Sequence, residues 1–271
     1  MNNSYFSRVA KKSGKLSKVL PSVYPELPYN FLMKLLRKKD VKLNGKGVSD
    51  VNVSVGDNLS LFLKPNAVPL EIVFENEQIF CVKKPKSLIS DGVYSLASLA
   101  EFVFPNSQML HRLDTNTSGL VLFAKNSEVF DYLQNAMQEG KIEKTYQATV
   151  YGEVSFKNSL LKGYLLKDAS KGRVKIFDSA VKGSVPVSIV ANTISQKDGL
   201  SVLKITLHNG KTHQIRAQLA HEGCFIIGDG KYGDDRINKM YGFTSQELKA
   251  VGLKFNFSSD PFGLGGLEIK I

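Results

Sequence analysis

The sequence is organised around one stretch, residues 111–125, which reads HRLDTNTSGLVLFAK. Its first half is polar, and after Gly119 the apolar residues 120–124 have the pattern of a short buried strand. Polar side chains placed just before a rigid strand are typical of functional sites. An ordinary turn, in which Asp114 accepts hydrogen bonds from nearby hydroxyl and amide groups, accounts for the same composition.

In the form HRLD-x-x-TSGL-x-x-x-AK, this stretch resembles the catalytic motif of the RluA family of pseudouridine synthases. Enzymes of that family isomerise uridine to pseudouridine in RNA. The similarity runs without a gap, so it is more specific than a short glycine pattern. It implies that Asp114 is the catalytic nucleophile and that Arg112 fills the space that the target base leaves. His111 becomes a candidate RNA contact.

A second site element lies in residues 141–152, KIEKTYQATVYG, which alternate as a strand does. The alternation puts Lys144 and Tyr146 on one face with apolar residues, which an ordinary core or edge tyrosine would also satisfy. The segment resembles the K-x-Y-x-A-x-V-x-G motif of the same family. That resemblance implies that Tyr146 stacks beside the target base and acts in proton transfer, and that Lys144 contacts RNA from the same face.

A third element is the stretch of residues 209–223, NGKTHQIRAQLAHEG. Asn-Gly predicts a turn, Thr212 is a candidate helix cap, and Gly223 is a candidate helix end. Arg216 lies near the edge of the stripe that Ile215 and Leu219 would bury, and a buried arginine needs an acidic partner.

The same stretch resembles the G-[RK]-x-HQ[IL]R motif of the family, whose last arginine pairs with the catalytic aspartate. The resemblance therefore implies that Arg216 pairs with Asp114. Lys211 stands where arginine is commoner, which keeps the charge but loses the two-pronged geometry. Lys211 and His213 are further candidate RNA contacts.

Residues 228–238, GDGKYGDDRIN, resemble the G-D-x-x-YG element of the family, which packs below the site. Their form is closest to the subgroup that modifies large-subunit ribosomal RNA. The late glutamate of a calcium loop is absent, as is the Walker pattern. His111, His213 and His221 have no metal-ligand spacing, so we predict no metal. The reaction that the resemblance implies needs no cofactor.

Positive charge is concentrated in the first quarter of the chain. The net charge is +11, and residues 1–64 alone hold 12 Lys and Arg against 4 Asp and Glu, whereas the remaining 207 residues hold 24 against 21. A compact basic module beside a nearly neutral body indicates an anchor for a polyanion such as RNA. A merely solvated face is the alternative, and binding to a membrane surface is disfavoured because no long amphipathic basic helix is present.

Residues 15–63 predict two short helices followed by small strands, with an Asn-Gly hairpin at 44–45. This order resembles the small S4-like RNA-binding module, although Lys15-Leu16-Ser17 departs from the commoner Arg-Leu-Asp opening. The module would bind phosphates through cations on or after the second helix. These candidate RNA contacts are Lys34, Arg37, Lys38, Lys39 and Lys42.

The fold class predicted is α+β. We expect an S4-like domain over residues 1–64, with residues 1–15 loosely ordered, a linker over 65–69, and a catalytic domain over 70–271. Strand patterns without regular β-helix-β alternation predict a large, mainly antiparallel mixed sheet flanked by helices in the catalytic domain.

Composition also indicates the cellular compartment in which the protein is expected. No apolar run approaches a membrane span, and the N-terminus lacks a signal-peptide core. The two cysteines, Cys81 and Cys224, form no motif, which fits a reducing cytoplasm. We therefore expect a cytoplasmic monomer that binds RNA, with no membrane contact.

The prediction is an RNA pseudouridine synthase that most closely resembles those acting on 23S ribosomal RNA. One rival is a non-catalytic RNA-binding or ribosome-assembly protein, against which Asp114, Tyr146 and Arg216 argue together, since a clamp needs none of them. Another is a methyltransferase, which the absence of a glycine-rich nucleotide loop disfavours.

Overall fold

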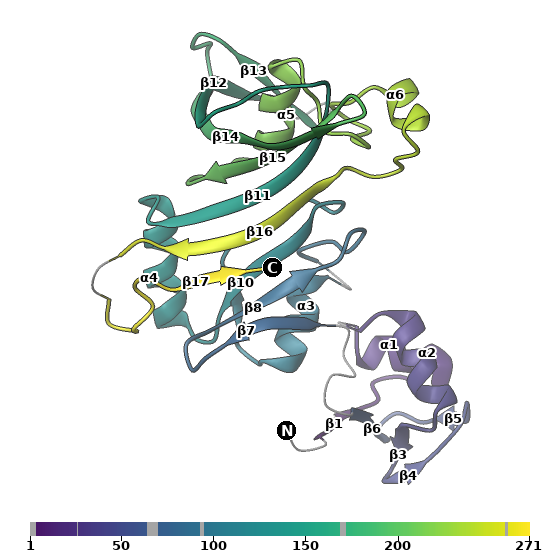
Figure 1. Cartoon of the computed structure of the whole chain (residues 1–271). Helices are drawn as coiled ribbons and strands as arrows, with labels where there is room; N and C mark the ends of the chain where they lie inside the picture. The colour runs from purple at the N-terminus through teal and green to yellow at the C-terminus, as the bar shows by residue number, and fades with distance from the viewer. Residues whose placement is uncertain (1–3, 26, 64–69, 93–94, 169–171, 258–259) are drawn as a thin grey trace. The chain divides into compact units, whose positions relative to one another are not determined.

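A computed structural model describes residues 4–25, 27–63, 70–92, 95–168, 172–257 and 260–271. The chain divides into two compact units (Figure 1), which are described separately below. The first unit comprises Met1–Glu71 and Ile89–Ser107, and the second comprises Ile72–Leu88 and Gln108–Ile271. The predicted linker at 65–69 lies outside the described residues, and the predicted domain boundaries stay a prediction.

The first unit packs helices on a small antiparallel sheet of order β1-β6-β3-β4. Tyr24 ties the helices to the sheet, because its hydroxyl lies 2.6 Å from the carbonyl oxygen of Phe6 and 2.7 Å from that of Leu59. Phe102 joins residues 89–107 to this unit, since its ring lies 4.5 Å from that of Phe6. The elements are β1 (Ser4–Val9), β2 (Gly14–Lys15), α1 (Leu16–Val23), α2 (Tyr29–Arg37), β3 (Val41–Leu43), β4 (Lys46–Gly47), β5 (Asn52–Val53), β6 (Asn58–Leu63) and α3 (Leu96–Val103).

The sequence predicted the helices and the hairpin of this unit but not its first strand. Residues 4–9, expected to be loose, pair along their whole length with β6. This strand lies at the edge of its sheet and carries little apolar alternation, so no periodic signal marked it. Pro21 lies inside α1, where it removes one backbone hydrogen bond.

The second unit is built on one large sheet of order β13-β12-β14-β15-β11-β16-β10-β8-β7, whose strands are labelled in Figure 1. Strands β10 and β16 are parallel, and the other defined pairings are antiparallel, which confirms the predicted mixed sheet. Its elements are β7 (Glu71–Glu75), β8 (Ile79–Lys84), β9 (Gln108–Met109), β10 (Ser118–Ala124), α4 (Ser127–Gln138), β11 (Ile142–Tyr151), β12 (Ser159–Asp168), β13 (Arg173–Phe177), β14 (Val185–Lys197), β15 (Leu200–Leu207), α5 (Gln214–His221), α6 (Asp235–Met240), β16 (Leu248–Phe255) and β17 (Glu268–Lys270).

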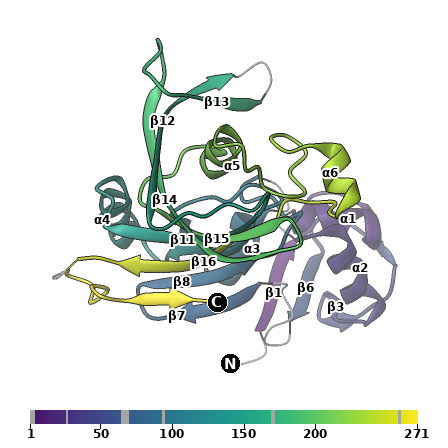
Figure 2. The ribbon, with the colours of Figure 1, turned by 45° about the horizontal axis from the view of Figure 1, so that its top comes forward.

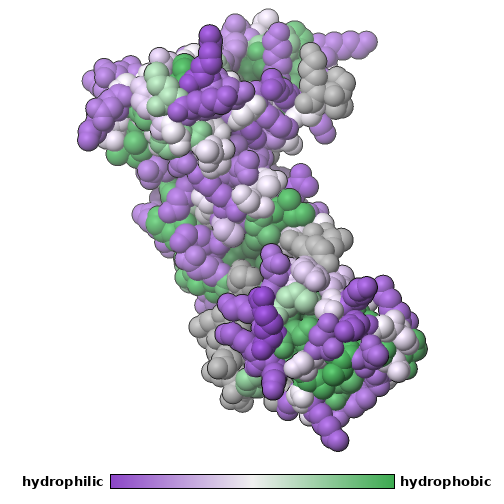
Figure 3. Space-filling view, turned by 90° about the vertical axis from the view of Figure 1, so that its right-hand side faces the viewer, coloured by the Kyte–Doolittle hydropathy of each residue, from purple (hydrophilic) through white to green (hydrophobic). Residues whose placement is uncertain are grey.

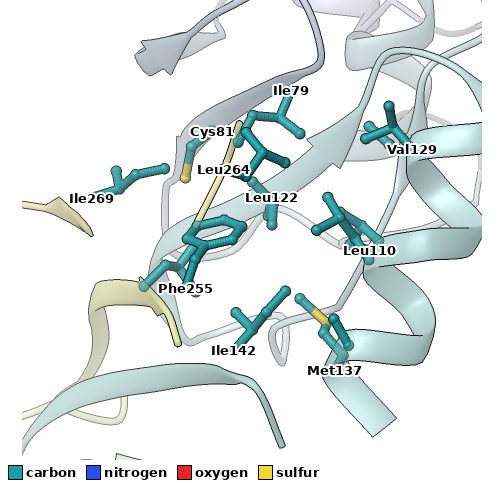
Figure 4. Close-up of a cluster of buried hydrophobic side chains, with 14 of the residues drawn as sticks. Ile79, Cys81, Leu110, Leu122, Val129, Met137, Ile142, Phe255, Leu264 and Ile269 are labelled. Carbon is teal, nitrogen blue, oxygen red and sulfur yellow. The ribbon is translucent and has the colours of Figure 1, made fainter. Parts of the chain in front are cut away.

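Two helices cover separate parts of this sheet. Helix α4 begins at Asn126, whose side chain accepts the N–H of Val129, and it buries Val129, Leu133 and Met137 in an apolar cluster with Ile142 (Figure 4). Helix α5 lies beside the hairpin of β12 and β13 (Figure 2), where Ala217 packs against Leu165, Val174, Ile176 and Val187.

In the parts of the chain that the structure describes, no helix is long and apolar enough to cross a membrane. Much of the face drawn in Figure 3 is hydrophilic, and hydrophobic residues appear on it as separate patches.

Gly119 is needed where β10 lies between β8 and β16. Its φ is +113°, and a Cβ there would lie 2.6 Å from the backbone nitrogen of Ala250 and would also overlap its carbonyl oxygen. We predict that Gly119→Ala lowers the free energy of unfolding by about 4 kcal/mol or more. Gly152, with φ +97° and no atom within 4 Å of such a Cβ, is the matched control, and Gly152→Ala should cost about 1 kcal/mol. Urea unfolding measures both, and equal losses would contradict the steric argument.

Candidate active site

Asp114 lies in the loop between β9 and β10, at the end of a central strand. Its carbonyl oxygen accepts the N–H of Thr117 at 3.0 Å, which closes a tight turn before the strand. The carboxylate side chain is 27% exposed, so it is supported by the protein and still open to a reactant.

Arg216 of α5 reaches this carboxylate from another part of the chain. Its Nη1 donates to Oδ2 of Asp114 at 2.7 Å, while Nε and Nη2 donate to the two oxygens of Asp229 at 2.6 and 2.8 Å. The arginine side chain is only 7% exposed. The carboxylate partner expected for Arg216 is thus present, and a second one, Asp229, was not foreseen.

Electrostatics keep Arg216 and Asp229 ionised. Burial lowers the pKa of Arg216, but the hydrogen bonds and charges of Asp229 and Asp114 outweigh it and raise the pKa. Burial would raise the pKa of Asp229, yet Arg216 and the backbone N–H groups of Lys231 and Tyr232 lower it. A buried arginine is costly unless carboxylates neutralise it, and here Asp229 accepts two of its N–H groups and Asp114 accepts one.

Tyr146 comes from the buried face of β11, as its alternation predicted. The pairing of β11 with β16 shifts register beside Tyr146: Thr145 pairs with Gly252 and Tyr146 with Ala250, so the extra residue of the bulge, Val251, lies in β16. Tyr146 is 6% exposed. Burial, with a smaller effect from the charge of Asp114, raises its pKa, so the phenol is neutral at physiological pH.

Lys84 binds the loop that carries Asp114 through the carbonyl oxygen of Thr115. It was not among the site residues predicted from the sequence. It is fully buried, and its Nζ donates to the carbonyl oxygens of Pro85, Leu88 and Thr115 at 3.0, 2.7 and 2.9 Å. Burial lowers the pKa of Lys84 to about 8, against the opposing charge of Asp114. The Lys84-Pro85 dipeptide at the end of β8 was the available signal in the sequence.

His213, which was predicted as an RNA contact, lies beside the carboxylate of Asp114. It precedes α5 with a left-handed backbone, φ 53° and ψ 17°, and its Nε2 is 3.9 Å from Oδ2 of Asp114. It is therefore the N-cap residue of α5, and the expectation that Thr212 caps this helix is wrong. The His213 ring also meets Tyr232, which was not predicted either.

Two predicted RNA contacts, His111 and Lys144, are less accessible than expected: His111 is half-buried and Lys144 is buried. Nε2 of His111 accepts the N–H of Leu122, and its Nδ1 is buried without a partner among the described residues. Lys144 is 6% exposed and donates to the carbonyl oxygen of His208. Burial lowers the pKa of His111 to about 3 and that of Lys144 to about 8. Lys144 is thus too buried for the predicted contact with RNA, whereas the contact predicted for the half-buried His111 stays a prediction.

The remaining predicted cations are accessible, which leaves their role open to test. Arg112 and Lys211 are exposed near the site. In the first unit, four cations at or beyond the end of α2 are exposed and one on β3 is half-buried: Lys34, Arg37, Lys38, Lys39 and Lys42.

Among the described residues, no group of three or more His, Cys, Asp or Glu side chains is arranged so that it could hold a metal ion. Cys81 and Cys224 are both buried free thiols, and burial raises the pKa of Cys81 to about 12 and that of Cys224 to about 11. The geometry instead centres on one accessible carboxylate held by an arginine, with a neutral tyrosine beside it.

Comparison with known proteins assigns a class to this arrangement. Residues 78–221 match the family model for RNA pseudouridylate synthase. Ribosomal large subunit pseudouridine synthase C of Rickettsia bellii is 30% identical over 267 residues, covering 83% of this chain and 84% of that protein. Ribosomal large subunit pseudouridine synthase D of Buchnera aphidicola is 27% identical over 285 residues, covering 94% and 90%.

A solved structure gives the same fold. Human RNA Pseudouridylate Synthase Domain Containing 1 superposes with a TM-score of 0.64 at 21% identity, over 77% of this chain and 86% of that one. The family model covers more than half of the chain, so the chain belongs to the RNA pseudouridylate synthase family and is an isomerase. The RluA-type resemblance is thereby confirmed, while the S4-like module stays a prediction.

Asp229 gives a testable consequence of the buried cluster. Asp229→Asn leaves the Arg216 charge with one carboxylate, so we predict a loss of about 3 kcal/mol in the free energy of unfolding at pH 7. Because the folded pKa of Asp229 is depressed, its contribution is present above its unfolded pKa of about 4 and is lost as the pH falls further. The difference from wild type should therefore shrink below about pH 4.

Asp234→Asn is the matched control for this substitution. Asp234 caps α6 through the N–H groups of Arg236 and Ile237, and asparagine caps equally well. Urea unfolding at several pH values measures both variants. A near-neutral Asp229→Asn, or a deficit that does not change with pH, would show that Asp229 does not neutralise Arg216.

Proposed function

We propose that this protein isomerises specific uridines of large-subunit ribosomal RNA, with Asp114 as the nucleophile. The observation that carries the proposal is the geometry of Asp114, which is partly exposed while one of its oxygens is held by a buried arginine. The printed names of the bacterial relatives support the choice of ribosomal RNA as the substrate class.

Isomerisation of uridine to pseudouridine through this mechanism needs a carboxylate nucleophile and no co-reactant. The bond between uracil N1 and the ribose is exchanged for one from C5, so C5 loses a proton and N1 gains one. The product is an isomer of the substrate, and no oxidant or group donor enters. Arg216, fixed by Asp229, holds one oxygen of Asp114 through a charge-assisted hydrogen bond.

Tyr146 and Arg112 handle the base in this proposal. The target must leave the helix stack at a cost of a few kcal/mol. The neutral ring of Tyr146, which feels the charge of Asp114, stacks on the uracil, and its hydroxyl can pass a proton. The exposed Arg112, two residues before Asp114, fills the space that the base has left.

The first unit adds affinity in this proposal. Its two helices, small sheet and exposed cations support an S4-like RNA-binding module that contacts phosphates without choosing the base. We infer that the protein acts as a monomer in the cytoplasm, where ribosomal RNA is processed.

A non-catalytic clamp that holds RNA is the alternative. It would have no use for a buried arginine shared between two carboxylates beside a neutral tyrosine, since phosphate binding calls for exposed cations. This cluster favours the enzyme.

Asp114→Asn is the test of the proposed nucleophile. Asparagine keeps the shape but cannot attack, so we predict that turnover falls by at least about 1,000-fold. Pseudouridine is mapped by carbodiimide stops in ribosomal RNA from cells with wild-type protein, none, or the variant. The exposed Asp131 of α4 supplies the control Asp131→Asn, which should leave every stop in place. Stops that persist with Asp114→Asn but vanish in the null would exclude Asp114, and unchanged stops in both would favour the clamp.

The cations of α2 yield a separate prediction about binding. In the full chain, Arg37→Gln and Lys38→Gln should each weaken RNA binding and reduce the slope of log affinity against log salt by about 1. Lys157→Gln, an exposed lysine of the second unit, should leave the slope unchanged. Fluorescence titration of a labelled ribosomal RNA fragment over a salt series gives the slopes. Equal slopes for all four proteins would remove the first unit from the RNA interface.

A further inference from the structure

The hydroxyl group of Tyr232 occupies a defined place in a chain of hydrogen bonds. Its oxygen accepts the backbone N–H of Val174 at 2.8 Å. Strand β13 is the edge strand of its sheet, so this N–H would otherwise lack a partner. The ring of Tyr232 also lies against the guanidinium of Arg216, with 5.2 Å between the Arg216 carbon and the ring centroid.

The hydroxyl hydrogen of Tyr232 needs an acceptor, and Nδ1 of His213 lies 3.0 Å from the oxygen. If Tyr232 donates to Nδ1, that nitrogen carries no proton, and the proton of the neutral imidazole is on Nε2. The opposite tautomer would leave the hydroxyl hydrogen unbonded. It would also turn a bare nitrogen lone pair toward the carboxylate of Asp114.

The charge state of His213 fits this assignment. Burial lowers its pKa; Asp114 and Asp229 oppose the effect, while Arg216 and Lys231 add to it, and the net shift is downward. The imidazole is therefore neutral at physiological pH. Burial also raises the pKa of Tyr232, which keeps the phenol protonated as a donor.

Nε2 of His213 then presents its N–H to one particular oxygen. It faces Oδ2 of Asp114 at 3.9 Å, the oxygen that already accepts Arg216 at 2.7 Å. This separation is longer than a hydrogen bond, and active-site contacts of this kind commonly shorten when substrate binds. Oδ1 accepts no hydrogen bond from the residues that the structure describes.

We propose that Tyr232 and His213 are positioning residues: Tyr232 holds His213 in its Nε2–H tautomer, and His213 joins Arg216 in holding Oδ2 of Asp114, so that Oδ1 is the attacking oxygen. The reaction part of this inference rests on the proposed function. The tautomer part is independent of it.

The left-handed backbone of His213 belongs to the same arrangement. Such a φ is uncommon for a residue other than glycine, although histidine and asparagine adopt it more readily than most. It places the ring at the start of α5, between Tyr232 and Asp114, instead of continuing the helix outward. Asparagine is therefore the conservative replacement for removing the ring.

The first test reads the tautomer directly. The chain has four histidines, so ¹⁵N-histidine labelling gives a spectrum simple enough to assign with His213→Asn. At pH 7 the wild-type His213 should show Nδ1 in the unprotonated range and Nε2 in the protonated range. Free imidazole already favours this tautomer, so the decisive comparison is Tyr232→Phe, in which His213 should become a mixture. A mixture in the wild type, or no change in the variant, overturns the assignment.

The second test measures catalysis on a ribosomal RNA fragment. Tyr232→Phe keeps the ring against Arg216 and removes only the hydroxyl, so kcat should fall about tenfold while KM stays within about twofold. Tyr241→Phe is the matched control, because the Tyr241 hydroxyl bonds the carbonyl oxygen of Asp198. It should change neither constant.

A third variant tests whether the Tyr232 hydroxyl acts by positioning His213 or only by supporting the hairpin of β12 and β13. Val174→Pro removes the N–H that Tyr232 accepts, at an edge strand where proline is tolerated, but leaves the hydroxyl free to donate to His213. It should keep both the tautomer and kcat of the wild type. If Val174→Pro loses activity as Tyr232→Phe does, the hydroxyl only supports the hairpin.

The outcomes distinguish this inference from the proposed function. A tautomer that responds to Tyr232→Phe without a fall in kcat overturns the positioning role. Full activity of Asp114→Asn removes the proposed nucleophile, and with it the role of Oδ1, while the tautomer result stands.

Discussion

The second unit depends on the neutralisation of one buried positive charge. A guanidinium with 7% exposure is costly unless its donors are met, and Arg216 meets this need with carboxylates 102 and 13 residues away along the chain. The cluster therefore forms only when α5, the loop before β10 and the segment after α5 have come together. Folding and assembly of the site are one event, because the same ion pairs serve both.

The sheet determines where the cluster of Asp114, Arg216 and Asp229 lies relative to Tyr146. Gly119 lets β10 approach β16 closely, and the loop of Asp114 enters the sheet at this point. The next strand, β11, pairs with β16 and carries Tyr146 on its buried face, where the phenol is within the electrostatic influence of Asp114. Lys84 fixes the remaining freedom of the loop by binding the carbonyl oxygen of Thr115.

Much of the fold and site could be read from the sequence where a local pattern carried the information. Alternation put Tyr146 on the buried face of β11, and the resemblance paired Arg216 with Asp114, as the structure has them. Patterns could not tell that Lys144 on the same face is too buried to meet RNA, because depth depends on what packs above a strand. The partnership of Asp229 with Arg216, like the edge strand β1, depends on contacts distant in sequence, which periodicity does not record.

The bond between Val174 and Tyr232 has a consequence for the behaviour of the protein at high concentration. An edge strand with an open N–H offers a template on which a strand of another copy can add, which leads to edge-to-edge association. At Val174 this position is already taken by a side chain from outside the sheet. The phenol that borders the active site thus also closes one place where molecules of this protein could otherwise join into a continuous sheet.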